Sequence, residues 1–407
     1  MSAALYIHVP FCRHKCIYCD FYSITQQNRI VEYAPTLHKE IDLWANDTFF
    51  ANVQFSTVYF GGGTPSLLSP TIIHGILKKL FSSFKFTSTV EITMEVNPGA
   101  LLMKYLKGYK AAGVNRLSIG VQSFSDNDLQ FLTRIHSAQH AQDAVLGARR
   151  AGFANIGIDL IFGLPGQSPE SWRRNMRQAV HVQPEHISIY GLTFEQHTPL
   201  WSMLKTGEVQ QCDDAVERDM FINAIDLLRD AGYEQYEISN FAVSGFRSRH
   251  NQKYWDSSPF LSFGPSAHSF DGQRRWWNHA DFLMWRQDIK ESKRPLAGEE
   301  KLGILQRAEE GVLLGLRRKT GVALSHLCHL IGVPDIDFLS RLQAMVGGID
   351  SVMGFEKSAQ DYLLTTWNNH LCLTKQGILL CNNITENIFK LVNIAFRGAA
   401  LRSEKQF

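Results

Sequence analysis

Short apolar runs alternate with segments of helical periodicity through the first half of the chain, and this alternation constrains the fold more than any other feature. Strands that alternate with helices build βαβ units, because two parallel strands need a crossover connection. The sequence therefore predicts an α/β fold with a parallel sheet. The expected strands span residues 5–9, 57–60, 90–96, 116–121, 156–162 and 186–192.

Six strands predict an incomplete, TIM-like (β/α)6 barrel, since a full barrel has eight strands. Apolar side chains recur every three or four residues between the strands, as amphipathic helices require. The expected helices span residues 30–44, 71–81, 101–112, 126–151, 169–182 and 213–231.

The rest of the chain changes character. Residues 233–277 are predicted to be irregular, 282–290 helical and 291–301 a charged linker. Beyond them, helical periodicity with one short hairpin indicates a helix-rich, winged-helix-like C-terminal module. Its helices are expected at 302–316, 320–331, 336–346 and 374–391, and its hairpin at 362–364 with 371–373. We predict three parts: a barrel (1–240), an extension (241–290) and a C-terminal domain (291–407).

Composition excludes several classes of function. The 41 basic and 39 acidic residues give a formal net charge of +2, so no overall field attracts nucleic acid. No apolar run reaches the roughly 20 residues of a membrane span. The N-terminus lacks the charged and apolar regions of a secretion signal. We expect a cytoplasmic protein without a transmembrane segment or a nucleic-acid partner.

Three of the seven cysteines lie within eight residues, directly after the first expected strand. Cys12, Cys16 and Cys19 have the spacing C-x3-C-x2-C, which suits an iron–sulfur cluster because thiolates are soft ligands. Three thiolates on a [4Fe–4S] cluster leave one iron open to a substrate. A zinc site completed by His14 or Asp20 is the alternative. The other cysteines, at 212, 328, 372 and 381, are expected to pack.

Glycines and polar residues stand at or near the ends of the expected strands, where barrels of this type build their sites. A Gly-Gly-Gly-Thr-Pro run at 61–65 ends the second strand. Glu95 and Gln122 end the third and fourth strands, and Asp159 lies in the fifth. A carboxylate in a buried strand needs a partner. A ligand or Arg134 would supply one; an ion network inside the barrel is the alternative.

The cysteine triplet after a first strand, followed by an aromatic residue, resembles the radical S-adenosylmethionine (SAM) superfamily. The resemblance implies a [4Fe–4S] cluster on Cys12, Cys16 and Cys19, whose open iron binds the amino and carboxyl groups of SAM. Within this superfamily, residues from near 5 to about 390 are similar to the oxygen-independent coproporphyrinogen oxidase-like (HemN-like) family. The segments that carry this similarity are 6–12, 61–65, 95–98, 120–124, 158–165 and 264–268.

The family resemblance also implies site residues, position by position. Tyr6, Gly62 and Glu95 would contact the SAM beside the cluster. The residues that match a second SAM site of the oxidase are Tyr18, Gly63, Thr64, Gln122, Arg134 and Asp159.

Two features separate the branches of this family. The oxidases carry a fourth cysteine two residues after the third, where this chain has Phe21. Residues 249–255, Arg-His-Asn-Gln-Lys-Tyr-Trp, resemble the H-N-x-x-Y-W signature of the HemW haem chaperones. A neutral imidazole can ligate haem iron. His250 is therefore expected to ligate haem, and Arg247, Arg249 and Lys253 to pair with its propionates.

We therefore expect a haem chaperone whose cofactors are a [4Fe–4S] cluster, SAM and haem. Its expected partners are haem-accepting membrane proteins, reached by peripheral contact with the membrane, and an electron donor. No residue is assigned a catalytic role, and enzymatic activity stays an open alternative. The alternatives are the oxidase, which decarboxylates coproporphyrinogen III, and a zinc-bound interaction protein.

Overall fold

A computed structural model describes residues 2–101, 103–334, 364–367 and 369–404. The chain divides into two compact units. The first comprises Met1–Gln235, Ser239–Lys253 and Ser258–Glu300, and the second comprises Tyr236–Ile238, Tyr254–Ser257 and Lys301–Phe407. The division into three parts stays a prediction.

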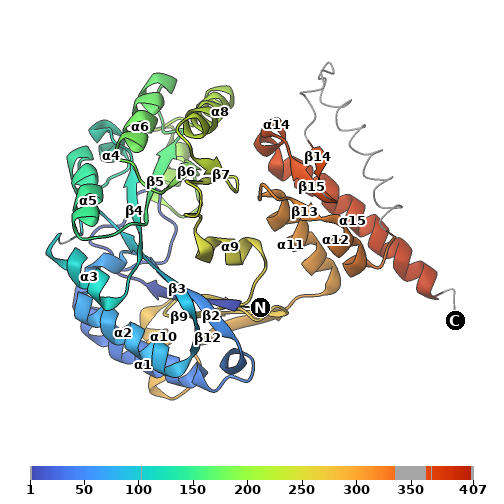
Figure 1. Ribbon diagram of the computed structural model, residues 1–407, viewed down its shortest axis with the longest axis horizontal. Helices are drawn as coiled ribbons and strands as arrows, with labels where there is room; N and C mark the ends of the chain where they lie inside the picture. Colours follow the sequence, from blue (N-terminus) through green and yellow to red (C-terminus); the bar gives the residue numbers. More distant parts are fainter. Residues whose placement is uncertain (1, 102, 335–363, 368, 405–407) are drawn as a thin grey trace. The chain divides into compact units, whose positions relative to one another are not determined.

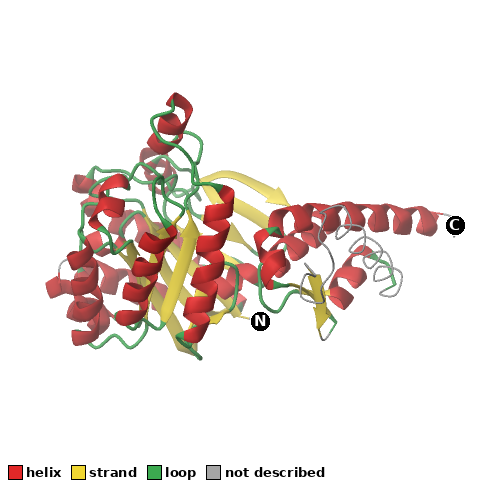
Figure 2. Cartoon of the chain, turned by 90° about the horizontal axis from the view of Figure 1, so that it is seen from above, coloured by secondary structure: helices red, strands yellow, loops and turns green. Residues whose placement is uncertain are grey.

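Six parallel strands form the centre of the first unit, in chain order, which confirms the partial barrel. Helices cover the outer side of these strands (Figures 1 and 2). The strands are β1 (Ser2–Val9), β2 (Gln54–Gly62), β3 (Lys85–Val96), β4 (Arg116–Gln122), β5 (Ile156–Phe162) and β6 (His186–Gly191). The helices are α1 (Ile30–Ala45), α2 (Pro70–Ser83), α3 (Leu106–Ala112), α4 (Asp126–Phe131), α5 (Ala138–Arg150), α6 (Pro169–His181), α7 (Pro199–Thr206) and α8 (Asp214–Asp230).

Local sequence specifies where several of these helices begin. The side chains of Ser69, Ser168 and Thr198 accept backbone N–H groups at the starts of α2, α6 and α7. Each cap is followed by proline, whose fixed φ suits the first helical position. The starts of α2 and α6 lie within one residue of the positions expected from periodicity, whereas α7 was not predicted.

The single helix expected at 126–151 is wrong, because the chain forms α4 and α5 with a break between them. Thr133 adopts a φ of 54° in this break, which an α-helix cannot accommodate. Ser137 then caps α5 in a reciprocal arrangement with His140. The break places Arg134 outside both helices, and its Nη2 donates to the carbonyl oxygen of Gly120 at 2.8 Å.

The irregular stretch expected at 233–277 and the linker expected at 291–301 are also wrong, since both contain strands. These short strands extend the sheet to the order β12-β11-β10-β9-β1-β2-β3-β4-β5-β6-β8-β7. Strands this short contain too few residues to show a clear alternation of apolar and polar side chains. Whether they form therefore depends on pairing with strands far away in the sequence. The elements are β7 (Glu234–Gln235), β8 (Asn240–Ala242), α9 (Arg249–Trp255), β9 (Phe260–Phe263), β10 (His268–Phe270), β11 (Arg274–Asn278), α10 (Phe282–Lys290) and β12 (Leu296–Lys301).

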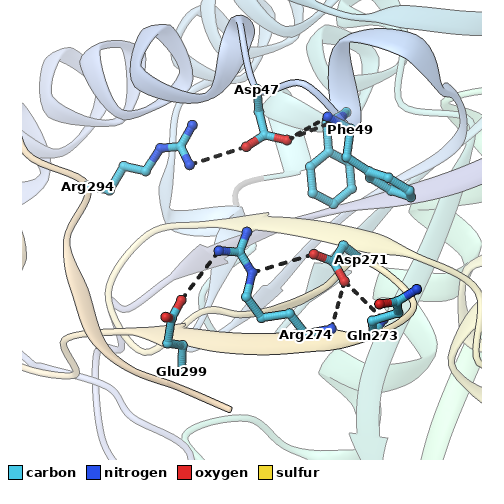
Figure 3. Close-up of polar contacts among 8 residues, drawn as sticks. Asp47, Phe49, Asp271, Gln273, Arg274, Arg294 and Glu299 are labelled. Atoms are coloured by element: carbon cyan, nitrogen blue, oxygen red, sulfur yellow. Dashed lines mark hydrogen bonds and ion pairs between the residues drawn. The ribbon is translucent and has the colours of Figure 1, made fainter. Parts of the chain in front are cut away.

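Stacked tryptophans join β11 to α1. The rings of Trp44 and Trp276 lie 5.2 Å apart with 11° between their planes. The guanidinium groups of Arg294 and Arg274 lie 3.7 Å from the Trp44 ring and 4.7 Å from the Trp276 ring, respectively. Acidic side chains hold both arginines: Asp47 pairs with Arg294, and Asp271 and Glu299 pair with Arg274 (Figure 3). This stack attaches the added strands to the barrel.

Replacing Trp276 with alanine is expected to lower the free energy of unfolding by about 3–5 kcal/mol, because it removes a buried indole and its two stacking partners. The midpoint of urea unfolding, followed by far-ultraviolet circular dichroism, measures the loss. Trp277→Ala is the matched control, since Trp277 is only half-buried and contacts the exposed His268. Equal losses in the two variants would contradict a specific role for the stack.

The second unit packs helices around a three-stranded sheet of order β13-β15-β14. The hairpin of β14 and β15 confirms the prediction, and the helix expected at 336–346 lies outside the described residues. The single closing helix expected at 374–391 is instead two helices, which are separated at Leu380. Its elements are α11 (Ile304–Leu316), β13 (Val322–Ala323), α12 (Leu324–Ile331), β14 (Leu364–Trp367), β15 (His370–Leu373), α14 (Lys375–Leu379) and α15 (Cys381–Glu404). In the described parts of both units, no helix combines the length and apolarity of a membrane span.

Candidate cluster and SAM site

The cysteine loop follows β1 directly and is closed at its base. Ile24 donates its backbone N–H to the carbonyl oxygen of Pro10 at 2.7 Å, and Cys12 donates its own to Ile24 at 2.9 Å. Cys16 is buried and the other two cysteines are half-buried. The loop therefore presents three thiols from a backbone that is anchored to the first strand.

The donor set of this loop fits a [4Fe–4S] cluster. Burial, together with smaller contributions from the neighbouring Cys12 and Cys16, raises the pKa of Cys19 to about 11. Thiols in this environment ionise when cationic irons bind them. Among the described residues, no three His, Cys, Asp or Glu side chains are arranged around a single metal ion. In a cluster each thiolate binds a different iron.

The glycine run at the end of β2 lies directly against this loop. Gly63 and Thr64 donate their backbone N–H groups to the carbonyl oxygens of Val9 and Phe11, at 2.8 and 2.7 Å. A Cβ atom on Gly63 would lie 2.7 Å from the Phe11 carbonyl oxygen. Gly62 has a φ of +105°, and a Cβ there would meet the His8 ring at 2.7 Å. The glycines therefore allow β2 to approach the cluster loop closely.

Replacing Gly63 with alanine is expected to displace the cluster loop, because its Cβ would meet backbone atoms that cannot rotate away. We expect a loss of about 1–3 kcal/mol in the free energy of unfolding and lower iron content after reconstitution. Gly75→Ala is the control: its Cβ would have no neighbour nearer than 3.9 Å, and alanine favours the helix α2. Full iron loading in Gly63→Ala would contradict this role.

Glu95 lies at the inner end of β3 with a specific partner. The Tyr59 hydroxyl donates to its Oε1 at 2.8 Å, and the Gly62 amide also donates to the carboxylate. Burial raises the pKa of Glu95 to about 7 in spite of these donors. The Tyr6 ring stacks on Tyr59 at 6.1 Å. Tyr6, Tyr59 and Glu95 thus form one group beside the glycine run, and a cationic ligand group would stabilise its carboxylate.

Asp159 and Arg116 place further charge inside the barrel. Ser118 donates to Asp159 at 3.2 Å, and burial raises the pKa of this carboxyl. Arg116 is 1% exposed, and its Nε has no hydrogen-bond partner in the structure. The sequence analysis missed Arg116, Tyr59 and His8. A signal was present for two of them, since every second residue of a strand faces the same side. His8 shares the parity of Tyr6 in β1, and Arg116 shares that of Gln122 in β4.

Arg134, Tyr18 and Gln122 meet near the C-terminal end of β4. Arg134 Nη1 donates to the Tyr18 hydroxyl at 3.5 Å and to Cys16 Sγ at 3.7 Å. Gln122 has a φ of 65°, an unfavourable conformation for a residue other than glycine. A Cβ on Gly120 would lie 2.9 Å from Gln122 Nε2 and 3.5 Å from Arg134 Nη2. The structure therefore brings these predicted SAM contacts together beside the cluster loop.

His250 lies inside the barrel, directly beside Tyr59 and Tyr6 of the group that contains Glu95. It is 1% exposed, and its Nδ1 hydrogen-bonds to Thr57 Oγ1 at 2.9 Å. Its ring stacks on Tyr59 at 4.8 Å, and its backbone N–H donates to Glu91 at 3.1 Å. Burial lowers the pKa of His250 to about 3, so the ring is neutral. In this conformation a porphyrin does not reach the imidazole.

The cations expected to hold haem propionates also have partners within the chain. Arg247 pairs with Glu234 at 2.7 Å. Arg249 donates to the Thr89 carbonyl oxygen at 2.6 Å, and Lys253 donates to Ser2. These contacts hold residues 247–253 within the first unit.

Fold and site together define the class of protein. Residues 6–179 match the radical SAM superfamily. The fold is similar to the solved structure of HemN from Escherichia coli, described as a coproporphyrinogen III oxidase and a radical SAM enzyme. The TM-score is 0.80, with 24% identity over 95% of this chain and 89% of that one. The chain is a radical SAM protein with the HemN-type fold.

Comparison with curated proteins specifies the branch. The protein called heme chaperone HemW from Bacillus subtilis is 32% identical, over 93% of this chain and 97% of that protein. Its namesake from Synechocystis is 34% identical over 96% and 97%. Mitochondrial radical SAM domain-containing protein 1 of Danio rerio is 33% identical over 80% and 75%. The chain belongs to the HemW branch of the HemN-like family.

Proposed function

We propose that this protein is a cytoplasmic haem chaperone that carries a [4Fe–4S] cluster and SAM, binds haem and passes it to membrane haemoproteins. The observation that carries the proposal is the similarity, over nearly the whole length, to proteins named heme chaperone HemW. Delivery would involve contact at the membrane surface, and reduction of the cluster would need an electron donor.

The residue at the fourth cysteine position supports the chaperone over the oxidase. Phe21 occupies that position, and its side chain is 66% exposed. A phenyl ring cannot supply the thiol that the oxidases carry there.

Cys12, Cys16 and Cys19 would hold the cluster, which when reduced supplies the electron that cleaves the sulfonium of SAM. Around it, Glu95 would accept the ammonium group of the first SAM, and the peptide group of Gly62 would lie against its methionyl part. Tyr6 would contact the same SAM. Gly63, Thr64, Tyr18, Gln122 and Asp159 offer the groups that match a second SAM. Arg134 offers a cation for a carboxylate.

His250 as the haem ligand stays a prediction, and its burial sets a condition on it. The imidazole would have to leave Thr57 and Tyr59, which requires the first turn of α9 to open. If α9 stays closed, His250 supports Tyr59, and another side chain ligates the iron. The exposed His268 on β10 is the natural comparison in the same unit.

Haem titration of the reconstituted protein tests the function. We expect a shifted Soret band that saturates, and no decarboxylation of coproporphyrinogen III under anaerobic reducing conditions with SAM. Appreciable decarboxylation would overturn the chaperone proposal in favour of the oxidase. His250→Ala is compared with His268→Ala in the same titration. An unchanged Soret position and affinity in His250→Ala would remove His250 as the ligand.

A further inference from the structure

Each sulfur of the cysteine triplet receives a hydrogen bond from a residue that the structure describes. Thr64 Oγ1 donates to Cys12 Sγ at 3.5 Å. Arg134 Nη1 donates to Cys16 Sγ at 3.7 Å. The backbone N–H of Phe21 donates to Cys19. Two of these donors are neutral, and the third is a guanidinium group.

The arginine is held in place from several directions. Its Nη2 donates to Gly120 in β4 at 2.8 Å. The neighbouring Thr133 accepts the backbone N–H of Ile17 from the cysteine loop at 3.2 Å. On the other side, the His136 ring hydrogen-bonds to the Val121 carbonyl oxygen at 3.0 Å. The break between α4 and α5 thus connects β4 to the cysteine loop, and Arg134 lies at its centre.

The burial of its acceptor makes this contact electrostatically strong. Cys16 is 8% exposed, and the buried Nε of Arg134 has no hydrogen-bond partner among the residues that the structure describes. Arg13 and Lys15 lie on the same loop, but both are exposed to solvent, which screens their charges. Arg134 is therefore the cation in the described site that acts on the cysteine sulfurs at short range and with little screening.

Reduction adds one negative charge to an iron–sulfur cluster, and donors to its sulfurs stabilise that charge. We infer that Arg134 is a positioning residue that sets the reduction potential of the cluster through its charged hydrogen bond to Cys16, with Thr64 supplying a weaker, neutral contribution at Cys12. The inference rests on the proposed cluster. It assigns the protein control over how readily the cluster accepts an electron.

The test measures the cluster itself rather than the activity of the protein. Full-length protein is reconstituted anaerobically, iron and sulfide are counted, and a redox titration without SAM is followed by electron paramagnetic resonance. We expect the Arg134→Gln variant to be harder to reduce. At the midpoint potential of the wild type, its ratio of reduced to oxidised cluster should be at least tenfold lower, which corresponds to a midpoint potential lower by about 59 mV for one electron. Arg134→Lys keeps the charge, and its midpoint potential should lie between those of the wild type and Arg134→Gln. Arg13→Gln removes an exposed charge and should match the wild type.

The outcomes separate the inference from the proposed function. A wild-type protein without iron and sulfide overturns the proposed cluster before any potential is measured. A fully loaded Arg134→Gln variant with the wild-type potential overturns the inference, as does an equal shift in Arg13→Gln. If Arg134→Gln does not hold iron, Arg134→Lys decides, because it keeps the positive charge but loses the guanidinium contact with Cys16. A smaller shift in the same direction supports the inference, and an unchanged potential overturns it.

Discussion

Replacing Cys16 with alanine is expected to remove the iron–sulfur cluster while the barrel stays folded. Reconstituted wild-type protein should contain about four iron atoms and four sulfides per chain, and the variant close to none. The reason is that the cluster has three protein ligands, so the loss of one leaves two irons without a thiolate. SAM binding at the open iron should be lost with the cluster.

A second cysteine of the chain provides a matched control for the iron content of Cys16→Ala. Cys212→Ala removes a half-buried thiol just before α8, outside the cysteine loop, and should keep the full iron content. Metal analysis and the visible absorption of the cluster measure both variants, and circular dichroism checks the fold. One zinc per wild-type chain, without sulfide, would contradict the cluster and support the zinc-bound alternative.

Replacing Glu95 with glutamine is expected to weaken SAM binding by about 10- to 100-fold, since one charge-assisted hydrogen bond contributes about 1.5–3 kcal/mol. The carboxylate is buried, and it accepts hydrogen bonds from the Tyr59 hydroxyl and the Gly62 amide. A cationic ammonium would supply what these neutral donors do not. Isothermal titration of SAM into cluster-loaded protein measures the change.

The same residue predicts a pH dependence. Because the pKa of Glu95 is about 7 in the ligand-free protein, the carboxyl is increasingly protonated below pH 7. A bound ammonium favours the ionised form, so binding releases a proton, and the affinity for SAM falls as the pH falls. We expect the wild-type affinity for SAM to fall about fivefold between pH 7 and 6, and to approach a tenfold loss per pH unit only at lower pH. The Glu95→Gln variant should lack this contribution.

Glu91→Gln is the matched control for both measurements. Glu91 lies on the same strand, four residues earlier and on the same face, but accepts the backbone N–H groups of Arg249 and His250. Its replacement should leave SAM affinity and its pH dependence unchanged. A similar loss in Glu91→Gln would show that burial of charge, rather than contact with SAM, explains the effect.

Much of the site could be predicted because it depends on short spacings and on strand parity. The three cysteines lie within one loop, and Gly62, Glu95 and Gln122 stand at or near the ends of strands. In a parallel barrel these ends lie on one side, so sequence position alone brings such residues together. Arg134 was predicted as a site residue, although the helix break that orients it was missed.

Other parts depend on partners far away in the chain. The buried position of His250 results from contacts with Thr57 and Glu91, which lie 193 and 159 residues earlier. A signature that contains this histidine does not reveal whether the ring faces solvent or the barrel interior. The short strands from β7 to β12 likewise depend on distant partners, since they form by pairing with other strands rather than from a periodic pattern in their own sequence.

The amino-acid sequence by itself determined the α/β alternation, the cysteine triplet and the family, because each depends on local spacing and on the order of residue types. Only the tertiary structure decided that Arg134 donates to Cys16, that Tyr59 donates to Glu95 and that His250 is buried. The physical reason is that hydrogen bonds and desolvation act over a few ångströms in space. They therefore depend on which distant segments the fold brings together, and this is what sets the charge around the cysteine sulfurs.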